Sequence, residues 1–437
     1  MEHNIPELVV QLTLEEKAGL CSGADFWHTK TVERLGIPTL MVSDGPHGLR
    51  TQDPEQDDPN HSRKAVCFPA GCSVAASFDP DLARREGAAI GREARAFGVG
   101  VVLGPAVNIK RSPLCGRNFE YYSEDPVLAG ELATGYINGV QSQGVGTSIK
   151  HFAANSQEYR RMSASSDMTE RTLREIYLRG FEIAVEEGDP WGCMTAANGL
   201  NGDLCSDSRW LLNDVLKGEW GFKGLVLTDF CHSRSTEKAA LAGLDIDMPW
   251  GDFETIKFGK PLMDAVARGD VPQSVLDEMV RRILWVKWKT GMLDHKDMKA
   301  GAALNTPENQ QVARRAAAES MVLLKNDRNT LPVRKPNRVA LFGKTSYDFI
   351  AGGTGSGEVH YGHAVSLKEG LSNVGFRISS AADRFYTRFV DSVFAAGGHK
   401  KYAVTRSQEP RIDKALVEAE AKVTDMGVVT LGRLSGE

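Results

Sequence analysis

The amino-acid sequence predicts an α/β protein whose main body is a (β/α)8 barrel of parallel strands. Runs of β-favouring apolar residues alternate with helical stretches from residue 37 to about residue 290, and this alternation is typical of βαβ units and a parallel sheet. The number of repeats and their span favour a closed barrel. An open doubly wound sheet stays the alternative, although the sequence lacks the glycine-rich phosphate fingerprint of many such sheets.

Length and charge limit the classes of function. The chain has 437 residues, which is long for one hydrophobic core, so we expect two domains. Its formal net charge is −5, with acidic and basic residues interspersed. Because no basic face is available to hold a phosphate backbone, the sequence argues against nucleic acid as a partner.

The N-terminal residues and the cysteines predict a soluble, cytoplasmic protein with no membrane partner and no cofactor. Residues 1–17 lack the basic start and apolar core of a signal peptide, and no stretch of about eighteen apolar residues occurs. The seven cysteines show no C-x-x-C spacing, so we expect reduced thiols rather than disulfides or a zinc site. No ligand-spaced cluster such as H-E-x-x-H predicts a metal.

Local signals place the expected elements. Thr13 and Glu16 have the spacing of a capping box. Asp-Pro pairs at 79–80 and 125–126 supply the N-cap and the first-turn proline of two long helices, which end near Gly98 and Gly144. The other expected helices of the barrel are 170–187, 210–220 and 233–242. The expected strands are 37–42, 99–103, 145–149, 192–195, 224–228 and 244–248.

The strand at 224–228 is the centre of the candidate site. Its apolar residues, bounded by glycine, are typical of a strand buried on both faces, and Asp229 follows where the strand meets a loop. A carboxylate at such a position is costly unless it is solvated, paired or used in chemistry. Asp229 is either the N-cap of the helix at 233–242 or a catalytic residue. Four other apolar runs that end in polar residues favour catalysis.

Polar side chains that follow the strands are expected to converge, because the loops after barrel strands meet at one rim. These residues are Asp44, Arg117, Lys150, His151, Met194, Asp229 and Asp247. Acids and bases at close range satisfy hydroxyl groups that both donate and accept, so the rim suits a polyhydroxylated small molecule. Structural alternatives exist for single residues: Arg161 beside Arg160 on a solvated face, and His151 and Met194 as core side chains.

Five stretches of the sequence resemble the β-glucosidases of glycoside hydrolase family 3. They are Asp44–Arg50 (DGPHGLR), Gly116–Pro126 (GRNFEYYSEDP), Lys150–Phe152 (KHF), Thr228–Phe230 (TDF) and Ala242–Pro249 (AGLDIDMP). The two longest are specific in themselves, and the short ones count because they follow in the family's order. The resemblance runs from about residue 12 to the last residue.

The resemblance implies a barrel domain over residues 1–300, followed over 301–437 by a linker and the N-terminal part of an α/β sandwich domain that is incomplete at its C-terminus. In that family the active site lies between the two domains. The second domain would follow a helix at 309–325 and begin with a strand at 338–343. Its loop at 352–357 would bring Ser356 to the sugar pocket. A flexible connector or a phosphate cradle is the alternative for this glycine-rich loop.

By the same resemblance, Asp229 is the nucleophile and Glu437, the last residue, is the acid/base. The sugar would contact Asp44, Arg50, Arg117, Lys150, His151, Arg161, Met194, Phe230 and Ser356. The family usually has tryptophan after the nucleophile and tyrosine three residues after the methionine. This chain has Phe230 and Ala197 there, and these departures bear on substrate choice.

The expected activity is hydrolysis of terminal, non-reducing β-D-glucosides or related β-glycosides through a covalent glycosyl-aspartate intermediate. A retaining glycosidase needs two carboxyl groups about 5 to 5.5 Å apart, which Asp229 and Glu437 would supply. One alternative is a sugar-binding or catalytically weak fragment. Another is a Schiff-base lysine at Lys150, as in an aldolase. The expected partner is a small-molecule glycoside; a homo-oligomer or a missing C-terminal portion stays open.

Overall fold

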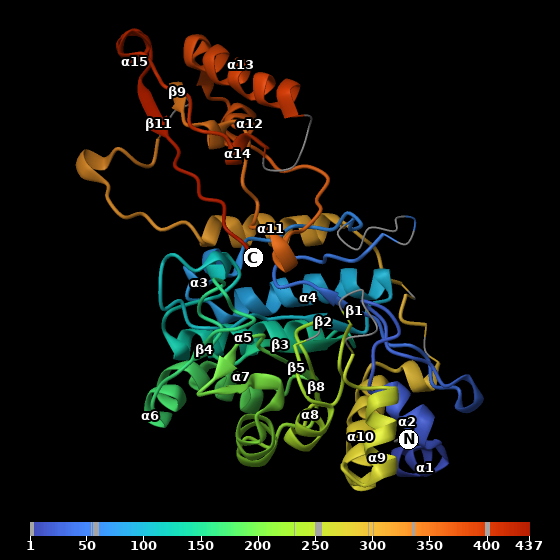
Figure 1. Ribbon diagram of the computed structural model, residues 1–437. Coiled ribbons are helices and arrows are strands. Elements are labelled where there is room, and N and C mark those ends of the chain that lie inside the picture. Colours follow the sequence, from blue (N-terminus) through green and yellow to red (C-terminus); the bar gives the residue numbers. More distant parts are fainter. Residues whose placement is uncertain are drawn as a thin grey trace. The chain divides into compact units, whose positions relative to one another are not determined.

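The computed structural model describes residues 4–437 except 54, 56–60, 231, 250–255, 296, 300, 334–336 and 398–402. The chain forms two compact units (Figure 1). The first comprises Met1–Met321 together with Gly355–His360 and Gly436–Glu437, and the second comprises Val322–Thr354 and Tyr361–Ser435. The expected boundary between two domains at residue 300 stays a prediction.

A five-stranded parallel sheet forms the centre of the first unit. Its strands lie side by side in the order β1 (Val42–Asp44), β2 (Val101–Leu103), β3 (Gly146–Phe152), β5 (Gly192–Thr195) and β8 (Leu225–Leu227). Every residue of these strands is buried, as expected for parallel strands that are covered on both faces. The predicted βαβ rhythm is therefore confirmed.

Isolated bridges continue this sheet from β8 back to β1. In order, the bridged pairs are Leu227 with Ile246, Asp247 with Ser22, Gly23 with Thr29, and His28 with Met41. The N–H of Val42 at the start of β1 donates to the carbonyl oxygen of Trp27 at 2.8 Å, which closes the ring. The barrel is thus completed by short parallel and antiparallel pairs in addition to the five regular strands.

Two expected strands differ in this closing part. The first strand begins at Val42 rather than at Ile37, because residues 37–41 contain Pro38, which has no N–H to donate, and instead make local antiparallel bridges. The run at 244–248 pairs only through Ile246 and Asp247. Both runs are apolar, and apolar character alone does not separate a regular strand from a buried bridge.

Helices surround the ring. In the first unit they are α1 (Ile5–Gln11), α2 (Leu14–Leu20), α3 (Gly71–Ala75), α4 (Pro80–Phe97), α5 (Pro126–Gln141), α6 (Glu170–Thr172), α7 (Arg179–Gly188), α8 (Thr236–Ala242), α9 (Lys260–Arg268), α10 (Gln273–Lys289) and α11 (Pro307–Glu319). A π-helical segment at Leu173–Leu178 joins α6 to α7, and another spans Trp210–Glu219. A small sheet beside them consists of β4 (Ser165–Ser166), β6 (Gly199–Leu200) and β7 (Asp203–Leu204).

The three helix starts that were predicted from capping signals are confirmed, whereas the helix expected from residue 233 begins at Thr236. Thr13 and Glu16 form a reciprocal capping box at α2, and Asp79 and Asp125 accept backbone N–H groups at the starts of α4 and α5. Gly98 ends α4 with φ of 81°, a left-handed conformation that a residue without Cβ adopts readily. These signals are local, which is why the sequence located them.

The second unit contains a three-stranded parallel sheet in the order β10 (Arg377–Ile378), β9 (Arg338–Phe342) and β11 (Met426–Val429). Its helices are α12 (Leu367–Asn373), α13 (Ser380–Gly397), α14 (Ala403–Arg406) and α15 (Lys414–Ala421). The α/β character expected here, with a first strand at 338–343, is confirmed. The helix expected at 309–325 is α11, which ends earlier, at Glu319.

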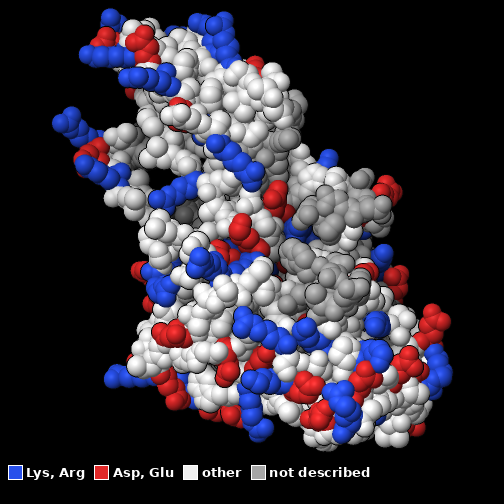
Figure 2. Space-filling model, in the orientation of Figure 1, with Lys and Arg blue, Asp and Glu red and all other residues white. Residues whose placement is uncertain are grey.

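Among the residues described, no helix combines the length and the apolar character needed to cross a membrane. On the face shown in Figure 2, Lys and Arg side chains lie among Asp and Glu side chains.

Candidate functional site

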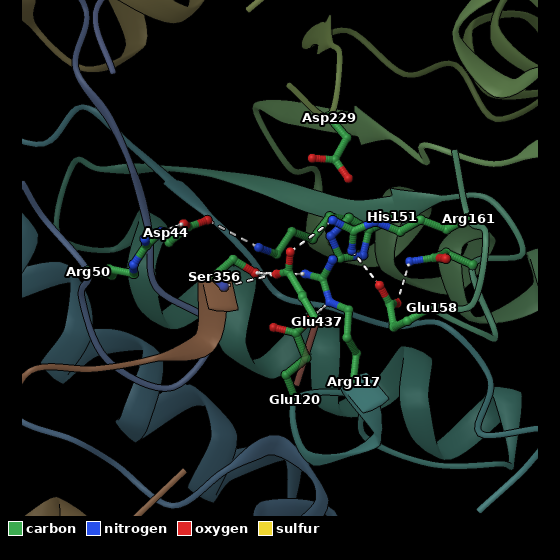
Figure 3. A network of polar contacts seen from close by, with 12 residues as sticks. Asp44, Arg50, Arg117, Glu120, His151, Glu158, Arg161, Asp229, Ser356 and Glu437 are labelled. Atoms are coloured by element: carbon green, nitrogen blue, oxygen red, sulfur yellow. Dashed lines mark hydrogen bonds and ion pairs between the residues drawn. The ribbon is translucent and has the colours of Figure 1, made fainter. Parts of the chain in front are cut away.

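The expected polar site residues come together within the first unit (Figure 3). Asp44 ends β1, Lys150 and His151 lie in β3, and Asp229 comes two residues after β8. Arg117 lies in a 3-10 turn at Gly116–Phe119. Arg161, Ser356 and Glu437 lie in loops, and the last two belong to the segments 355–360 and 436–437 of this same unit.

A buried carboxylate, Asp44, is held by two cations. Its Oδ2 accepts a hydrogen bond from Arg50 Nη1 at 3.1 Å, and its Oδ1 lies 3.4 Å from Lys150 Nζ. The side chains of Asp44 and Lys150 are 3% and 1% exposed. Burying these charges is tolerable because they are paired with one another. Both Asp44 oxygens face cations, so Lys150 is committed to an ion pair.

The carboxylate of Glu437 is clamped by three side chains. Arg161 Nη2 donates to Glu437 Oε2 at 2.9 Å, and Arg117 Nη2 lies 3.4 Å from Oε1. The hydroxyl of Ser356 donates to the same Oε1 at 2.5 Å. Burial alone raises a carboxyl pKa, but Arg117 and Arg161 lower the pKa of Glu437 well below its ordinary value of 4.5. The two guanidinium groups therefore favour the ionised form of Glu437 when no substrate is bound.

Arg117 connects this clamp to a second acid. Its Nε donates to Glu120 Oε1 at 2.5 Å and its Nη2 donates to Ser356 Oγ at 2.8 Å. Burial works against the charged form, yet Glu120 and Glu437 raise the pKa of Arg117 well above its ordinary value. A guanidinium spreads five N–H donors over three nitrogens and can reach acceptors that lie far apart, whereas a lysine carries its three donors on one nitrogen.

His151 is fixed in its neutral form. Its backbone exchanges two hydrogen bonds of 2.8 Å with the side chain of Asn108, and its Nδ1 lies 3.2 Å from the hydroxyl of Tyr121. Burial, followed by the charges of Arg117 and Lys150, lowers the pKa of His151 well below its ordinary value. A neutral imidazole in this place can accept or donate one hydrogen bond without adding charge.

Asp229 is not a helix cap. Helix α8 begins at Thr236, and its N-cap is Ser235, whose hydroxyl accepts from the N–H of Lys238 at 3.2 Å. Asp229 Oδ1 accepts from the N–H of Phe230 at 3.0 Å. Its Oδ2 is buried and has no hydrogen-bond partner among the residues that the structure describes. The carboxylate points toward the group around Glu437 (Figure 3). A buried acceptor of this kind is costly unless a ligand meets it.

Two expected contacts are apolar. Phe230 stacks on Phe26 with ring centroids 4.3 Å apart and an angle of 15°, and it meets Trp27 edge-on at 5.7 Å. Met194 is 1% exposed and packs in the main hydrophobic core, and Ala197 is fully buried. The structure thus gives Met194 a packing role, and its contact with a sugar stays a prediction.

Asp247 serves the scaffold. Its Oδ2 accepts from the N–H of Lys257 at 2.7 Å, and its Oδ1 accepts from the hydroxyl of Thr228 at 3.3 Å. The neighbouring Asp245 is fully buried beside Lys217 at 3.1 Å. These carboxylates tie the loop after α8 to β8, and so support the strand that carries Asp229.

Two acids of the site, Glu120 and Glu158, had no role predicted from the sequence. Glu120 pairs with Arg117, and Glu158 pairs with Arg161 through Arg161 Nη1. Each acid stands three positions from its arginine, a spacing at which side chains meet on helical turns. This spacing was visible in the sequence and is the signal that could have found them.

In the part of the chain that the structure describes, no three His, Cys, Asp or Glu side chains are grouped as a metal-ligand set. The site is a network of carboxylates, guanidinium groups, an ammonium and an imidazole. Among the described residues, Asp229 Oδ2 and Glu120 Oε2 are buried acceptors of this network without a hydrogen-bond partner.

Comparison with known proteins shows the family to which the chain belongs. The sequence matches the Glycosyl hydrolase family 3 N terminal domain over residues 13–286 and the Glycosyl hydrolase family 3 C-terminal domain over residues 321–437. It is 51% identical over 345 residues to thermostable beta-glucosidase B of Acetivibrio thermocellus, covering 78% of this chain and 45% of the relative. It is 43% identical over 371 residues to a beta-glucosidase of Rhizobium radiobacter, covering 84% and 44%.

The fold is similar to that of beta-glucosidase 3B from Thermotoga neapolitana in complex with alpha-D-glucose. The TM-score is 0.92 at 37% sequence identity, covering 100% of this chain and 63% of that chain. The Bifidobacterium adolescentis GH3 beta-glucosidase gives 0.82 at 36% identity, covering 96% and 57%. The chain therefore spans about half the length of the relatives it matches.

Proposed function

We propose a hydrolytic function for this chain, which belongs to glycosyl hydrolase family 3. It hydrolyses terminal, non-reducing β-D-glucosides or closely related β-glycosides with retention of configuration. The observation that carries this proposal is the orphaned Oδ2 of Asp229, a buried carboxylate oxygen next to a strand end. An oxygen that no described residue meets is free to attack an anomeric carbon.

In the first step, Asp229 Oδ2 forms a bond to the anomeric carbon while the bond to the leaving oxygen breaks. Glu437 gives its proton to that oxygen. In the second step Glu437 takes a proton from water, which attacks the anomeric carbon and releases Asp229. Two inversions give net retention.

The remaining polar residues suit the sugar hydroxyls. Asp44 is an acceptor held by Arg50 and Lys150, His151 is a neutral partner, and Arg117 and Arg161 are donors. Such mixed groups serve hydroxyls that donate and accept. The choice of a glucoside rests on the relatives being beta-glucosidases and on the glucose in the Thermotoga neapolitana complex. The corresponding role is in carbohydrate breakdown.

A second candidate is a sugar-binding or weakly catalytic protein. The beta-glucosidase relatives do not favour this candidate; its one physical argument is that Arg117 and Arg161 lower the pKa of Glu437, since an ionised carboxylate cannot protonate a leaving group. Calorimetric binding of glucose together with no detectable turnover would support this candidate.

The Schiff-base alternative at Lys150 has little support. Lys150 Nζ is held against Asp44 Oδ1 and its side chain is 1% exposed, whereas a nucleophilic amine must be uncharged and accessible. Borohydride trapping with a carbonyl substrate would test it, and we expect no adduct at Lys150.

The test of the proposed function is hydrolysis of a panel of aryl glycosides, followed by proton NMR of the first-formed sugar. We expect β-glucosides to be preferred and the β-anomer of glucose to appear first. An initial α-anomer would contradict the two-step mechanism. No hydrolysis, with glucose bound, would favour the second candidate.

A further inference from the structure

The Arg161 guanidinium is shared between two carboxylates. Its Nη1 contacts Glu158 Oε2, and its Nη2 donates to Glu437 Oε2 at 2.9 Å. The three side chains lie in one row in the site (Figure 3). The side chain of Glu158 is 13% exposed and that of Arg161 is 11% exposed, so solvent screens this row only weakly.

We propose that Glu158 is a positioning residue for Glu437, acting through Arg161. By holding one edge of the guanidinium, Glu158 directs the other edge to Glu437, and its negative charge offsets part of the positive charge there. The proposal rests on the proposed role of Glu437 as the acid/base.

Glu158 is anchored on the side away from Arg161. Its Oε1 accepts from Asn155 Nδ2 at 3.2 Å, and the same Nδ2 donates to the hydroxyl of Tyr121 at 3.2 Å. Asn155 and Tyr121 are both buried, and Tyr121 in turn contacts His151. The carboxylate of Glu158 is therefore fixed to the buried polar network around β3, which makes it a rigid support for Arg161.

Glu158 adds a negative charge beside one of the two guanidinium groups that face Glu437. Glu158, Arg161 and Glu437 act on one another, and Arg117 and Asp229 are the other titratable groups that act on them. Arg117 in turn has four titratable neighbours, which are Glu120, Cys115, Tyr121 and His151. Two guanidinium groups face Glu437 directly. Without the charge of Glu158, more of the field of Arg161 would act on Glu437 and hold it ionised.

The pKa directions agree with this geometry. Burial raises the pKa of Glu158 above its ordinary value although Arg117 and Arg161 oppose it, and the charge of Glu437 raises it further. Glu158 and Glu437 thus compete for the same cation, and their titrations are coupled. A general acid must carry its proton when the substrate binds, so a competitor for Arg161 favours the working form of Glu437.

Arg161 also interacts with Asp229, the other catalytic group. Burial lowers the pKa of Arg161, but Asp229 and then Glu437 raise it above its ordinary value. The Arg161 guanidinium therefore interacts with both catalytic carboxylates, and it favours the ionised form of Glu437, which a general acid must avoid. Glu158 keeps the guanidinium of Arg161 in place and offsets part of its positive charge.

Two variants separate charge from orientation. Glu158→Gln keeps an oxygen that accepts from Arg161 but removes the charge, whereas Glu158→Ala removes both. Glu182→Gln is the control, because Glu182 pairs with Arg179 at the same three-residue spacing on α7, away from the site. Thermal unfolding of each variant checks that the fold is kept.

The readout is the ratio of kcat/KM on a β-glucoside with a poor leaving group to kcat/KM on a dinitrophenyl β-glucoside, which needs no proton. For Glu158→Gln we expect this ratio to fall about tenfold at neutral pH, which corresponds to a pKa of Glu437 lower by about one unit. Glu158→Ala should lose activity on both substrates, because Arg161 is released. Glu182→Gln should leave the ratio unchanged.

An unchanged ratio in a folded Glu158→Gln variant would overturn the proposal and leave the Glu158–Arg161 pair as a tie within its loop. Carbon-13 NMR of protein labelled at the glutamate carboxyls gives a test that does not need turnover, with Glu437→Gln for assignment. We expect the titration midpoint of Glu437 to be lower in Glu158→Gln than in the wild type. Equal midpoints would overturn the proposal; an inactive wild type with shifted midpoints would instead count against the proposed function alone.

Discussion

Ser356 and Glu437 are joined by two hydrogen bonds to one carboxylate oxygen. The backbone N–H and the hydroxyl of Ser356 donate to Glu437 Oε1 at 2.9 and 2.5 Å, across 81 positions of sequence. The preceding Gly355 has φ of +87°, and a Cβ there would lie 2.8 Å from Glu437 Cγ. The loop thus holds the carboxylate from one side while Arg117 and Arg161 hold it from the other.

Gly355→Ala should impair the site more than Ser356→Ala. Alanine in the left-handed region costs about 1 to 2 kcal/mol, and its Cβ would push against the Glu437 side chain, so the donors of Ser356 would move. Ser356→Ala loses the hydroxyl but keeps the N–H donor. We expect kcat on an aryl β-glucoside to fall at least tenfold in Gly355→Ala and severalfold in Ser356→Ala. If both variants kept the kcat of the wild type, the loop would not position Glu437.

Glu437→Gln should separate substrates by their leaving groups. Glutamine cannot donate a proton as an acid does, so substrates with poor leaving groups should lose several orders of magnitude in kcat/KM. A dinitrophenyl glucoside should lose far less in this value. A steady-state comparison of the two substrates measures the effect, and equal losses would assign Glu437 a structural role.

Arg117→Lys should destabilise the protein. Lysine cannot reach Glu120, Ser356 and Glu437 together, so buried Glu120 would lose its partner, at a cost of about 3 to 5 kcal/mol for breaking a buried ion pair. Urea denaturation followed by tryptophan fluorescence measures the free energy of unfolding. The control is Arg171→Lys, because the exposed pair of Arg171 with Glu175 contributes about 0 to 1 kcal/mol. Equal changes in the two variants would contradict the account.

His151 should make the protein less stable in mild acid. Its pKa in the folded protein lies well below the ordinary value of 6.5. As the pH falls below 6.5, the unfolded chain therefore binds a proton that the folded protein does not, and the free energy of unfolding decreases. His151→Gln should reduce this decrease, measured by urea denaturation between pH 7 and pH 5. The same slope in both proteins would mean that His151 is protonated in the fold.

The parts of the fold that depend on local signals could be predicted. Asp79 with Pro80 starts α4 and Gly98 ends it, because capping needs only neighbouring residues. The closure of the ring could not be predicted, because it depends on the pairing of Ser22 with Asp247, which lies far away in the sequence. Helix α11 ends at Glu319 although no glycine or proline stops it there, so the expected end at residue 325 was too late.

A site residue could be predicted where its burial would cost free energy unless the residue had a function. Asp229 met this criterion, and its use as a cap was settled only by Ser235, which caps α8 instead. The partners of Glu437 could not be inferred from residue types alone, because Ser356 and Arg161 reach it from distant loops. Phe230 was expected to bear on substrate choice, but its stacking on Phe26 depends on a loop that no local signal places.

Labelling of Asp229 by a 2-deoxy-2-fluoro β-glucoside with a good leaving group tests the central claim most directly. The fluorine slows the second step, so the sugar should stay bound to the nucleophile. We predict a single added sugar on the wild-type protein, located on Asp229 by peptide mapping with mass spectrometry, and none on a folded Asp229→Asn variant. A label on any other residue, or normal turnover by Asp229→Asn, would contradict the assignment of Asp229 as the nucleophile.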